Sequence, residues 1–402
     1  MSRSLPLALL AASLALTGCK KKEEPAAAQA QPAPLSAKAS KAIPQPESGK
    51  FNVAFVYVGP VGDGGWTWAH DQGRRYLEEK GAAHTAFVES VAEGAEAEQV
   101  VRSLARKGFD LVVGTSFGYM DAMEAAAGEF PQTKFVHIAG YKDNGKNFGS
   151  LFGAMESMKY LSGMIAGARA KADGQTKLGY IAPYPIPEVV RLGNALMLGA
   201  KKTCPECSME IRWISSWFDP AREREAAESL FKSGAWVVVT GADTPGPVTA
   251  AKDAGRWAIG YDSVNACSFA PERCLSTSYW NWGPTYLKLV EQMKAGTWNG
   301  GHEYLDVDSG LVGEFGFHGD QKPQPGVPAD VVPLVKQTLA QMQSGALTRF
   351  DLFAGPLEDN EGHALLKAGE KLDQKDLEGL AGCKVCMGWL AKGIVGQLPA
   401  RK

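Results

Sequence analysis

The fold is decided by the stretch SLARKGFDLVVG at residues 103–114, which returns as SLFKSGAWVVVT at residues 229–240. Each copy has the pattern of a helix end, a glycine stop at Gly108 or Gly234, and a short apolar strand. Ser103 corresponds to Ser229, and the offset of 126 residues is constant along both copies. The repeat therefore predicts two lobes of one topology and not a single large sheet.

Outward from these copies, short apolar strands alternate with amphipathic helices. Apolar strands separated by helices are typical of a parallel sheet that is covered on both faces, so an α/β protein is expected. Strands are predicted at residues 51–58, 85–88, 111–113, 134–138, 178–182, 210–214, 236–240 and 257–261, and helices at residues 71–80, 96–107, 187–201 and 220–234.

The composition is that of an ordinary globular protein, with 45% hydrophobic and 21% charged residues in a chain of 402. The 42 basic and 44 acidic side chains give a net charge of −2. Nucleic-acid binding rests on a basic face that neutralises phosphates, so this balance argues against a nucleic-acid partner.

The N-terminal segment predicts export and lipid anchoring. Leu5–Leu16 is an apolar run too short to span a bilayer, and Leu16-Thr17-Gly18-Cys19 has the pattern of a bacterial lipobox. We expect a signal peptide at residues 1–18, acylation of Cys19 and a disordered tether at residues 19–49. The folded body would then be held to the lipid bilayer through Cys19, in the cell envelope and facing the periplasm. The alternative is a plain secretory signal.

The six remaining cysteines are spaced for local disulfides, which exported proteins favour. A four-cysteine zinc site would need two distant C-x-x-C pairs to converge, and redox catalysis would need such a pair between a strand and a helix. We therefore expect disulfides and no metal site. The residues are Cys204, Cys207, Cys267, Cys274, Cys383 and Cys386.

Aromatic, carboxylate and amide side chains follow the ends of the expected strands. Ligands of parallel sheets bind beyond the carboxyl ends of the strands, so these loops should face one cleft. Flat rings with a few polar groups suit a planar or ring-shaped polar ligand. The candidate ligand-binding residues are Trp66, Thr67, Phe117, Tyr119, Pro187, Trp217, Phe218, Asp243, Asp262, Trp280 and Asn281.

Several of these loops carry a family resemblance. The chain resembles the basic membrane protein family of solute-binding lipoproteins that serve ABC transporters. The resemblance covers roughly residue 51 to the C-terminus without the cysteine loops, and it lies more in the order of segments than in any single motif. The segments are VYVGP at 56–60 with GGW at 64–66, TSFGYMD at 115–121, PIPEVV at 185–190, WFDP at 217–220 and WGP at 282–284.

The resemblance implies a type I periplasmic-binding-protein fold, in which two Rossmann-like lobes with parallel sheets are joined by a multi-strand hinge. Lobe 1 would comprise residues 50–152 and about 280–308, and lobe 2 residues 153–279 and about 309–350. Residues 351–402 would form a C-terminal extension packed on a lobe. The resemblance further implies a monomer without catalysis or cofactor, which binds a purine and delivers it to an ABC permease in the inner membrane.

The family pattern also implies roles for particular residues. Trp66 occupies the position of a Phe that stacks on the base, and Phe117 lies in the second loop of the same lobe. Trp217 or Phe218 would provide the ring from the other lobe. Asp243 would be the acid that bonds ring nitrogens or sugar hydroxyls of the ligand. Two departures concern the sugar. Thr67 replaces an Asn that binds ribose, and a Lys found near the hinge is replaced around Trp280 and Asn281. They favour a free nucleobase such as adenine over a nucleoside.

Two other functions fit parts of the sequence. Residues 114–118 match G-x-S-x-G between a strand and a helix, so Ser116 could be the nucleophile of an exported α/β-hydrolase, with His302, His318 or His363 as the base. The repeat argues against one hydrolase sheet. The other alternative is a sensory lipoprotein that passes ligand binding to a receptor instead of a permease.

Overall fold

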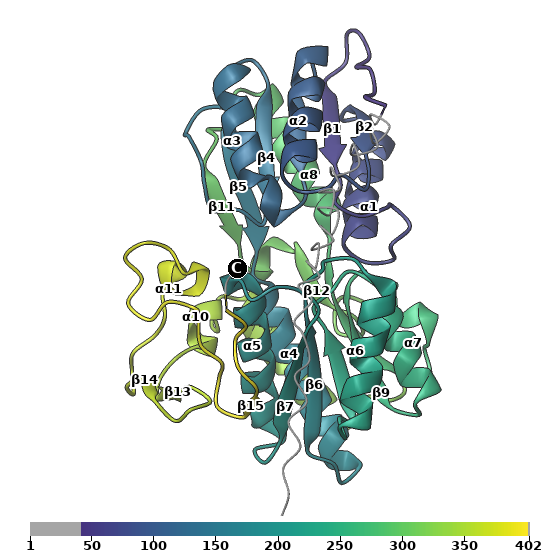
Figure 1. The fold of residues 1–402 in the computed structure, drawn as a ribbon, viewed down its shortest axis with the longest axis vertical. Helices are drawn as coiled ribbons and strands as arrows, with labels where there is room; N and C mark the ends of the chain where they lie inside the picture. Colours follow the sequence, from purple (N-terminus) through teal and green to yellow (C-terminus); the bar gives the residue numbers. More distant parts are fainter. Residues whose placement is uncertain (1–41, 401–402) are drawn as a thin grey trace, which may run out of the picture. The chain divides into compact units, whose positions relative to one another are not determined.

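The computed structural model describes residues 42–400 of the chain. The predicted signal peptide, the lipidation at Cys19 and most of the predicted tether lie outside these residues. Two parallel-dominated sheets form the frame of the described part (Figure 1). Within residues 42–400, no helix combines the length and the apolar character that crossing a bilayer requires.

The first lobe is built on a six-stranded parallel sheet in the order β11-β5-β4-β3-β1-β2. One face packs against α2 and α3, and the opposite face against α1 and α8. The strands are β1 (Asn52–Val56), β2 (His84–Val88), β3 (Leu111–Gly114), β4 (Lys134–Ile138), β5 (Phe148–Gly153) and β11 (His302–Leu305); the helices are α1 (Trp66–Glu79), α2 (Ala95–Lys107), α3 (Met120–Glu129) and α8 (Trp282–Lys294).

The second lobe repeats this architecture in a seven-stranded sheet of order β12-β10-β9-β8-β6-β7-β15. Only β12 is antiparallel to its neighbour among these strands. The strands are β6 (Lys177–Ala182), β7 (Ser208–Trp213), β8 (Val237–Thr240), β9 (Trp257–Asp262), β10 (Cys274–Trp280), β12 (Val312–Glu314) and β15 (Ile394–Val395); the helices are α4 (Met155–Ala172), α5 (Pro187–Thr203), α6 (Pro220–Lys232), α7 (Gly246–Asp253) and α9 (Val332–Gln343).

The chain passes between the lobes three times. It crosses after β5 through Ala154, after β10 through Asn281, and between β11 and β12 through residues 306–311, which include the short helix η3 (Val307–Ser309). Three adjacent crossings make a hinge, because each is short and continues directly into a strand or helix of the other lobe. The fold is therefore the two-lobed type I periplasmic-binding-protein architecture that the sequence predicted.

The C-terminal extension packs on the second lobe. Its final strand β15 pairs with β7, and the Asn194 side chain of α5 bonds the main chain of Trp389 and Ala391 at 2.9 and 2.8 Å. The extension also reaches the first lobe, where Glu378 lies 3.5 Å from His302 of β11. Its elements are α10 (Arg349–Leu352), β13 (Leu357–Glu358), β14 (Ala364–Leu366) and α11 (Gln374–Glu378).

One helix begins earlier than predicted. The pattern indicated a helix from Asp71, but α1 begins at Trp66. The reason is the buried carboxylate of Asp63, which accepts hydrogen bonds from the main-chain N–H groups of Gly65, Thr67 and Trp68 at 2.8 to 2.9 Å. A carboxylate that binds the free N–H groups of the first turn stabilises a helix N-terminus. It starts the helix directly beside the cleft.

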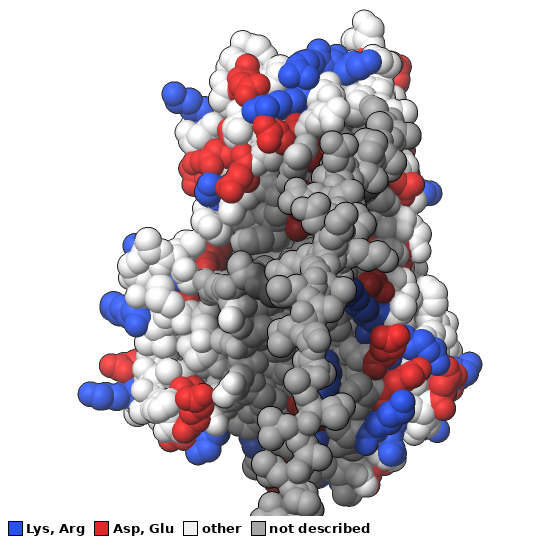
Figure 2. Space-filling view, in the orientation of Figure 1, with Lys and Arg blue, Asp and Glu red and all other residues white. Residues whose placement is uncertain are grey.

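Charged side chains of both signs are interspersed on the part of the surface that the space-filling view leaves uncovered (Figure 2). Lys142, for example, lies 2.8 and 2.7 Å from Asp121 and Glu124, and Arg224 lies 2.7 Å from Asp253. Exposed pairs of this kind contribute little to stability, typically about 0–1 kcal/mol each. Their mixing agrees with the near-zero net charge of the sequence.

Candidate ligand-binding cleft

A small cavity lies between the two lobes. Its walls come mainly from the carboxyl ends of parallel strands and the loops that follow them, as the topology of such sheets requires. The first lobe contributes Val58, Trp66, Ser116, Phe117 and Phe152, and the second contributes Glu188, Trp217, Gly241, Asp243, Tyr261 and Asp262.

Trp66 is held rigidly at the start of α1. Its indole N–H donates to the carbonyl oxygen of Thr115 at 2.7 Å. Its ring stands almost perpendicular to those of His70, Trp280 and Trp282, with interplanar angles of 82°, 83° and 88°. Edge-to-face packing of this kind is a favoured aromatic geometry. The ring is therefore oriented in advance for a planar ligand.

A stack of aromatic rings supports Trp66 from behind. Trp280 stacks on Trp282 with centroids 5.0 Å apart, and Trp282 stacks on both His70 and Tyr286 at 4.4 and 5.5 Å. Burial holds the pKa of His70 well below its ordinary value, so this imidazole is neutral within the stack. Because all four rings of the stack are uncharged, this wall of the cleft is apolar.

Two aspartates of the second lobe direct carboxyl groups at the cavity. Asp243 and Asp262 are 4% and 0% exposed, and one oxygen of each has no hydrogen-bond partner among the described residues. The other oxygen of Asp262 accepts from the indole N–H of Trp280 at 2.9 Å. Burial raises the pKa of both groups well above the ordinary value, and the mutual proximity raises that of Asp243 further. Buried acceptors without partners are what a ligand with N–H groups would satisfy.

Asp262 also sits in a strained backbone conformation, with φ of 62°. A non-glycine residue in this left-handed region costs free energy, and such strain concentrates at binding sites because the surrounding fold holds a side chain in place. The end of β9 thus turns the carboxylate toward the cavity instead of continuing the strand.

A buried lysine lies behind the aspartates. Lys159 of α4 donates to the carbonyl oxygen of Thr240 at 2.8 Å, and its ammonium lies 3.6 Å from the centre of the Tyr261 ring. Burial lowers the pKa of Lys159 to about 7, although the charges of Asp262 and Glu314 oppose this shift. Lys159 therefore balances the buried acids from outside the cavity and is not one of the residues that line it.

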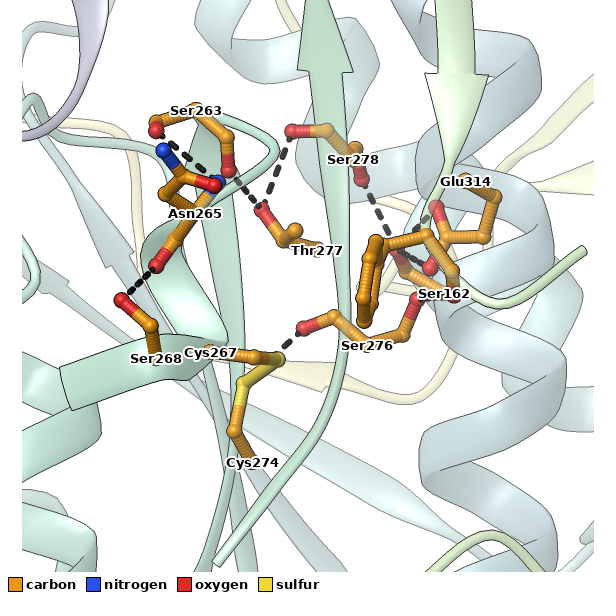
Figure 3. The surroundings of a disulfide bond; sticks show 11 residues. Ser162, Ser263, Asn265, Cys267, Ser268, Cys274, Ser276, Thr277, Ser278 and Glu314 are labelled. Atoms are coloured by element: carbon orange, nitrogen blue, oxygen red, sulfur yellow. Dashed lines mark hydrogen bonds between the residues drawn. A yellow bond between two sulfur atoms is a disulfide. The ribbon is translucent and has the colours of Figure 1, made fainter. Parts of the chain in front are cut away.

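The hinge end of the second lobe is tied by a hydrogen-bond network next to a disulfide (Figure 3). The Ser162 hydroxyl lies 3.0 Å from both carboxylate oxygens of Glu314 and 2.9 Å from the hydroxyl of Ser278. Nearby, Cys267 at the short helix η2 (Ala266–Phe269) is bonded to Cys274 at the start of β10. The network and the disulfide fix β10, the strand that leads into one crossing.

Five of the predicted ligand-binding residues line the cavity, and six do not. Thr67 is buried and accepts from the Gly59 N–H at 3.2 Å, while Tyr119 is buried and donates to the carbonyl of Val91 at 2.5 Å. Pro187 borders a neighbouring cavity, Phe218 is half-exposed outside it, Trp280 lies in the stack and Asn281 is exposed at the hinge. The five that line it are Trp66, Phe117, Trp217, Asp243 and Asp262.

Sequence reasoning missed six lining residues. Phe152 and Tyr261 lie within β5 and β9, and a ring inside a strand has the pattern of a core residue. Glu188 sits in the first turn of α5, in a segment that was noted only for its resemblance. Each of the three lies at an element end, which is the signal that could have found them. The others are Val58, Ser116 and Gly241.

The geometry does not support a hydrolase. The Ser116 hydroxyl donates to the carboxylate of Glu93 at 2.6 Å. The nearest histidine, His137, bonds the Ser116 carbonyl oxygen at 2.7 Å and not the hydroxyl. The proposed bases lie elsewhere: His302 beside Glu378, His318 beside Glu314 and His363 beside Asp359. The Ser116 hydroxyl is therefore bonded to a carboxylate, and none of the three histidines that the sequence offered as the base contacts it.

The cysteines form three local disulfides, Cys204–Cys207, Cys267–Cys274 and Cys383–Cys386. Both C-x-x-C pairs are thus closed on themselves. Across the described part of the chain, no group of three or more His, Cys, Asp or Glu side chains is arranged to hold a metal ion.

Two lobes that meet around an aromatic and acidic cavity are typical of a solute-binding protein. The sequence model of the family described as ABC transporter substrate-binding protein PnrA-like matches residues 50–324. The chain belongs to this family, whose members bind solutes for ABC transporters and are not enzymes.

Individual relatives agree with this assignment. The chain is 36% identical to a purine-binding protein of Brucella abortus over 354 residues, which cover 87% of this chain and 94% of that protein. It is 34% identical to a Haloferax volcanii protein named for glucose binding in an ABC transporter, over 80% of this chain and 78% of that one. A solved solute-binding protein of Conexibacter woesei superposes with a TM-score of 0.60 at 25% identity, over 74% of this chain and 97% of that chain.

Proposed function

We propose that this protein is the lipid-anchored receptor of a bacterial ABC importer and that it binds a purine, as the free base, in the cleft between its lobes. The observation that carries the proposal is one cavity that joins aromatic rings of both lobes to the partnerless carboxyl oxygens of Asp243 and Asp262. Rings stack on the faces of a base, and carboxyl groups accept from N–H groups at its edge.

The support for a base over a nucleoside comes from the aromatic stack. Trp280 donates its indole N–H to Asp262, so one oxygen of this carboxylate is engaged by protein and is not free for a sugar hydroxyl. Trp280 is also almost fully buried and packs against Phe152 with ring centroids 5.0 Å apart. The stack therefore closes the cavity on this side and leaves less room beside Asp262.

The likeness to the purine-binding protein of Brucella abortus supports the ligand class, because it extends over nearly the whole of both chains. A hexose is the second candidate. It is favoured by the relative named for glucose binding, and carboxylates with aromatic rings also suit sugars. Delivery to a permease in the inner membrane, anchoring through Cys19 and a monomeric state belong to the same proposal.

The proposal is tested by thermal unfolding of the purified protein with adenine, hypoxanthine, adenosine, ribose or glucose. A ligand that binds only the folded state stabilises it by about 2.7 kcal/mol at one hundred times its Kd. We expect the unfolding temperature to rise with a purine base and to stay constant with ribose and glucose. If the unfolding temperature rose with glucose alone, the proposed ligand would be a hexose and not a purine.

A further inference from the structure

The side chain of Glu188 lies at the wall of the ligand cavity. It is the second residue of α5 and follows Pro187, which starts the helix. Its side chain lines the ligand cavity and also the neighbouring cavity, where Pro187 and Arg191 lie. None of the hydrogen bonds and ion pairs within residues 42–400 engages its carboxyl group, in contrast to Glu156 and Glu223 nearby, whose carboxylates are bound.

The two buried cations near Glu188 are already engaged. Arg191 donates to the Tyr304 hydroxyl at 2.9 Å and to the Leu377 carbonyl at 3.3 Å, and it lies 3.4 Å from Glu156. Lys159 donates to the carbonyl of Thr240. Burial, more than any neighbouring charge, raises the pKa of Glu188 to about 7. The group therefore resembles Asp243 and Asp262 in being an acid that the protein leaves without a partner.

The cavity offers carboxyl oxygens that no protein group engages. Glu188, Asp243 and Asp262 bring three carboxyl groups to one small space, and buried oxygens of the two aspartates are unpartnered. Two other lining residues have polar hydrogens, but both are bonded within the protein. The Trp66 indole N–H donates to the Thr115 carbonyl, and the Ser116 hydroxyl donates to Glu93. A ligand with N–H groups would satisfy these oxygens.

Resting on the purine-binding function above, we propose that Glu188 contacts the ligand and that the three carboxyl groups select purines with exocyclic amino groups over oxopurines. An amino group presents N–H donors to a carboxyl oxygen. An oxo group at the same position presents lone pairs and leaves the buried acid unpaired, which is costly.

The test is calorimetric titration of the full-length protein in detergent with adenine, 2,6-diaminopurine, hypoxanthine and xanthine. We expect the amino-substituted bases to bind at least about tenfold more tightly than hypoxanthine, the usual scale when a buried polar group loses its partner. Glu188→Gln should reduce this ratio about fivefold or more, because its amide N–H₂ can donate to an oxo group. Glu225→Gln, on the exposed face of α6, is the matched control and should preserve the ratio.

Glu188→Asp provides a second variant that keeps the charge and withdraws it by one methylene, and thermal unfolding verifies that each variant folds. Equal affinities for adenine and hypoxanthine, or an unchanged ratio in both Glu188 variants, would overturn the selectivity while leaving purine binding intact. Failure of every purine to bind would instead overturn the proposed function, and this inference with it.

Discussion

Gly65 of the first lobe packs directly against the main-chain carbonyl oxygen of Asp243 in the second, so closely that a β-carbon at Gly65 would overlap it. Gly64 also lies close to the second lobe, because a β-carbon there would be 3.3 Å from both Phe269 and Pro245. The loop after β1 and the loop after β8 thus meet across the cleft. The described conformation is closed, and small residues in the first loop permit it.

Replacing Gly65 by alanine should therefore prevent full closure. We expect ligand affinity to fall at least about tenfold, because the closed state that completes the cavity becomes less populated. Calorimetry gives the affinity, and small-angle X-ray scattering with ligand should show a larger radius of gyration than for the unmodified protein. The matched control is Gly62→Ala in the same loop, where an added β-carbon meets nothing within 4 Å. Identical behaviour of the two variants would rule out the contact as a condition for closure.

Trp66→Ala should weaken purine binding at least about tenfold, since stacking contributes about 1–3 kcal/mol per base. Trp298, a partly buried tryptophan of the first lobe that does not line the cavity, serves as the comparison. Trp298→Ala should lower the unfolding temperature without changing the isotherm. If the Trp66→Ala isotherm were also unchanged, the ring would not be part of the site.

The repeat of residues 103–114 at 229–240 was enough to predict the two lobes, because a helix that a glycine ends and the apolar strand that follows it recur at a constant offset. The cavity residues Trp66, Phe117 and Trp217 were predictable for a related reason. Each follows a strand end, and in parallel sheets these ends meet at one edge.

The direction in which a side chain points could not be read from its position along the chain. Trp280 also follows a strand, but its ring stacks on Trp282 and becomes part of the wall behind Trp66. Which way such a ring turns depends on packing between elements that are distant in sequence. Glu188 presents the opposite case, since an acidic residue in a first helical turn is ordinarily explained by the helix dipole alone.

The buried neutral imidazole of His137 should contribute a loss of stability on acidification. His137 is fully buried, and burial lowers its pKa to about 4. Between pH 6.5 and 4, the imidazole of His137 is protonated in the unfolded chain and neutral in the folded chain. The contribution of His137 to the free energy of unfolding therefore decreases as pH falls. The difference in pKa between the unfolded and the folded chain corresponds to a loss of about 2–3 kcal/mol in the free energy of unfolding at pH 4.5.

The measurement is urea unfolding at pH 7 and 4.5 for the unmodified protein and for His137→Gln, whose amide can still donate to the Ser116 carbonyl. Between pH 7 and 4.5, the free energy of unfolding of the variant should fall by less than that of the unmodified protein, or rise by more, and the difference should be about 2–3 kcal/mol. An equal loss of stability in both proteins would show that His137 does not titrate in this way.

The Cys267–Cys274 disulfide should matter for ligand binding as well as for stability. It closes a short loop, which stabilises a fold by about 2–3 kcal/mol in the chain-entropy account. It also holds η2, whose Phe269 packs on Gly64 across the cleft. We expect the Cys267→Ser/Cys274→Ser double variant to bind ligand more weakly. Cys383→Ser/Cys386→Ser, in the extension, should leave affinity unchanged; equal effects of the two variants would contradict this role.

The most direct test of the account is calorimetric titration of the purified protein, after unfolding and refolding to remove bound ligand, with purine bases, their nucleosides and glucose. Sub-micromolar binding of a purine base, tighter than that of its nucleoside and lost in Asp243→Asn, is the predicted result, a free energy of about −8 kcal/mol or stronger. Heat with glucose and none with any purine would contradict the central claim that this cleft is a purine site.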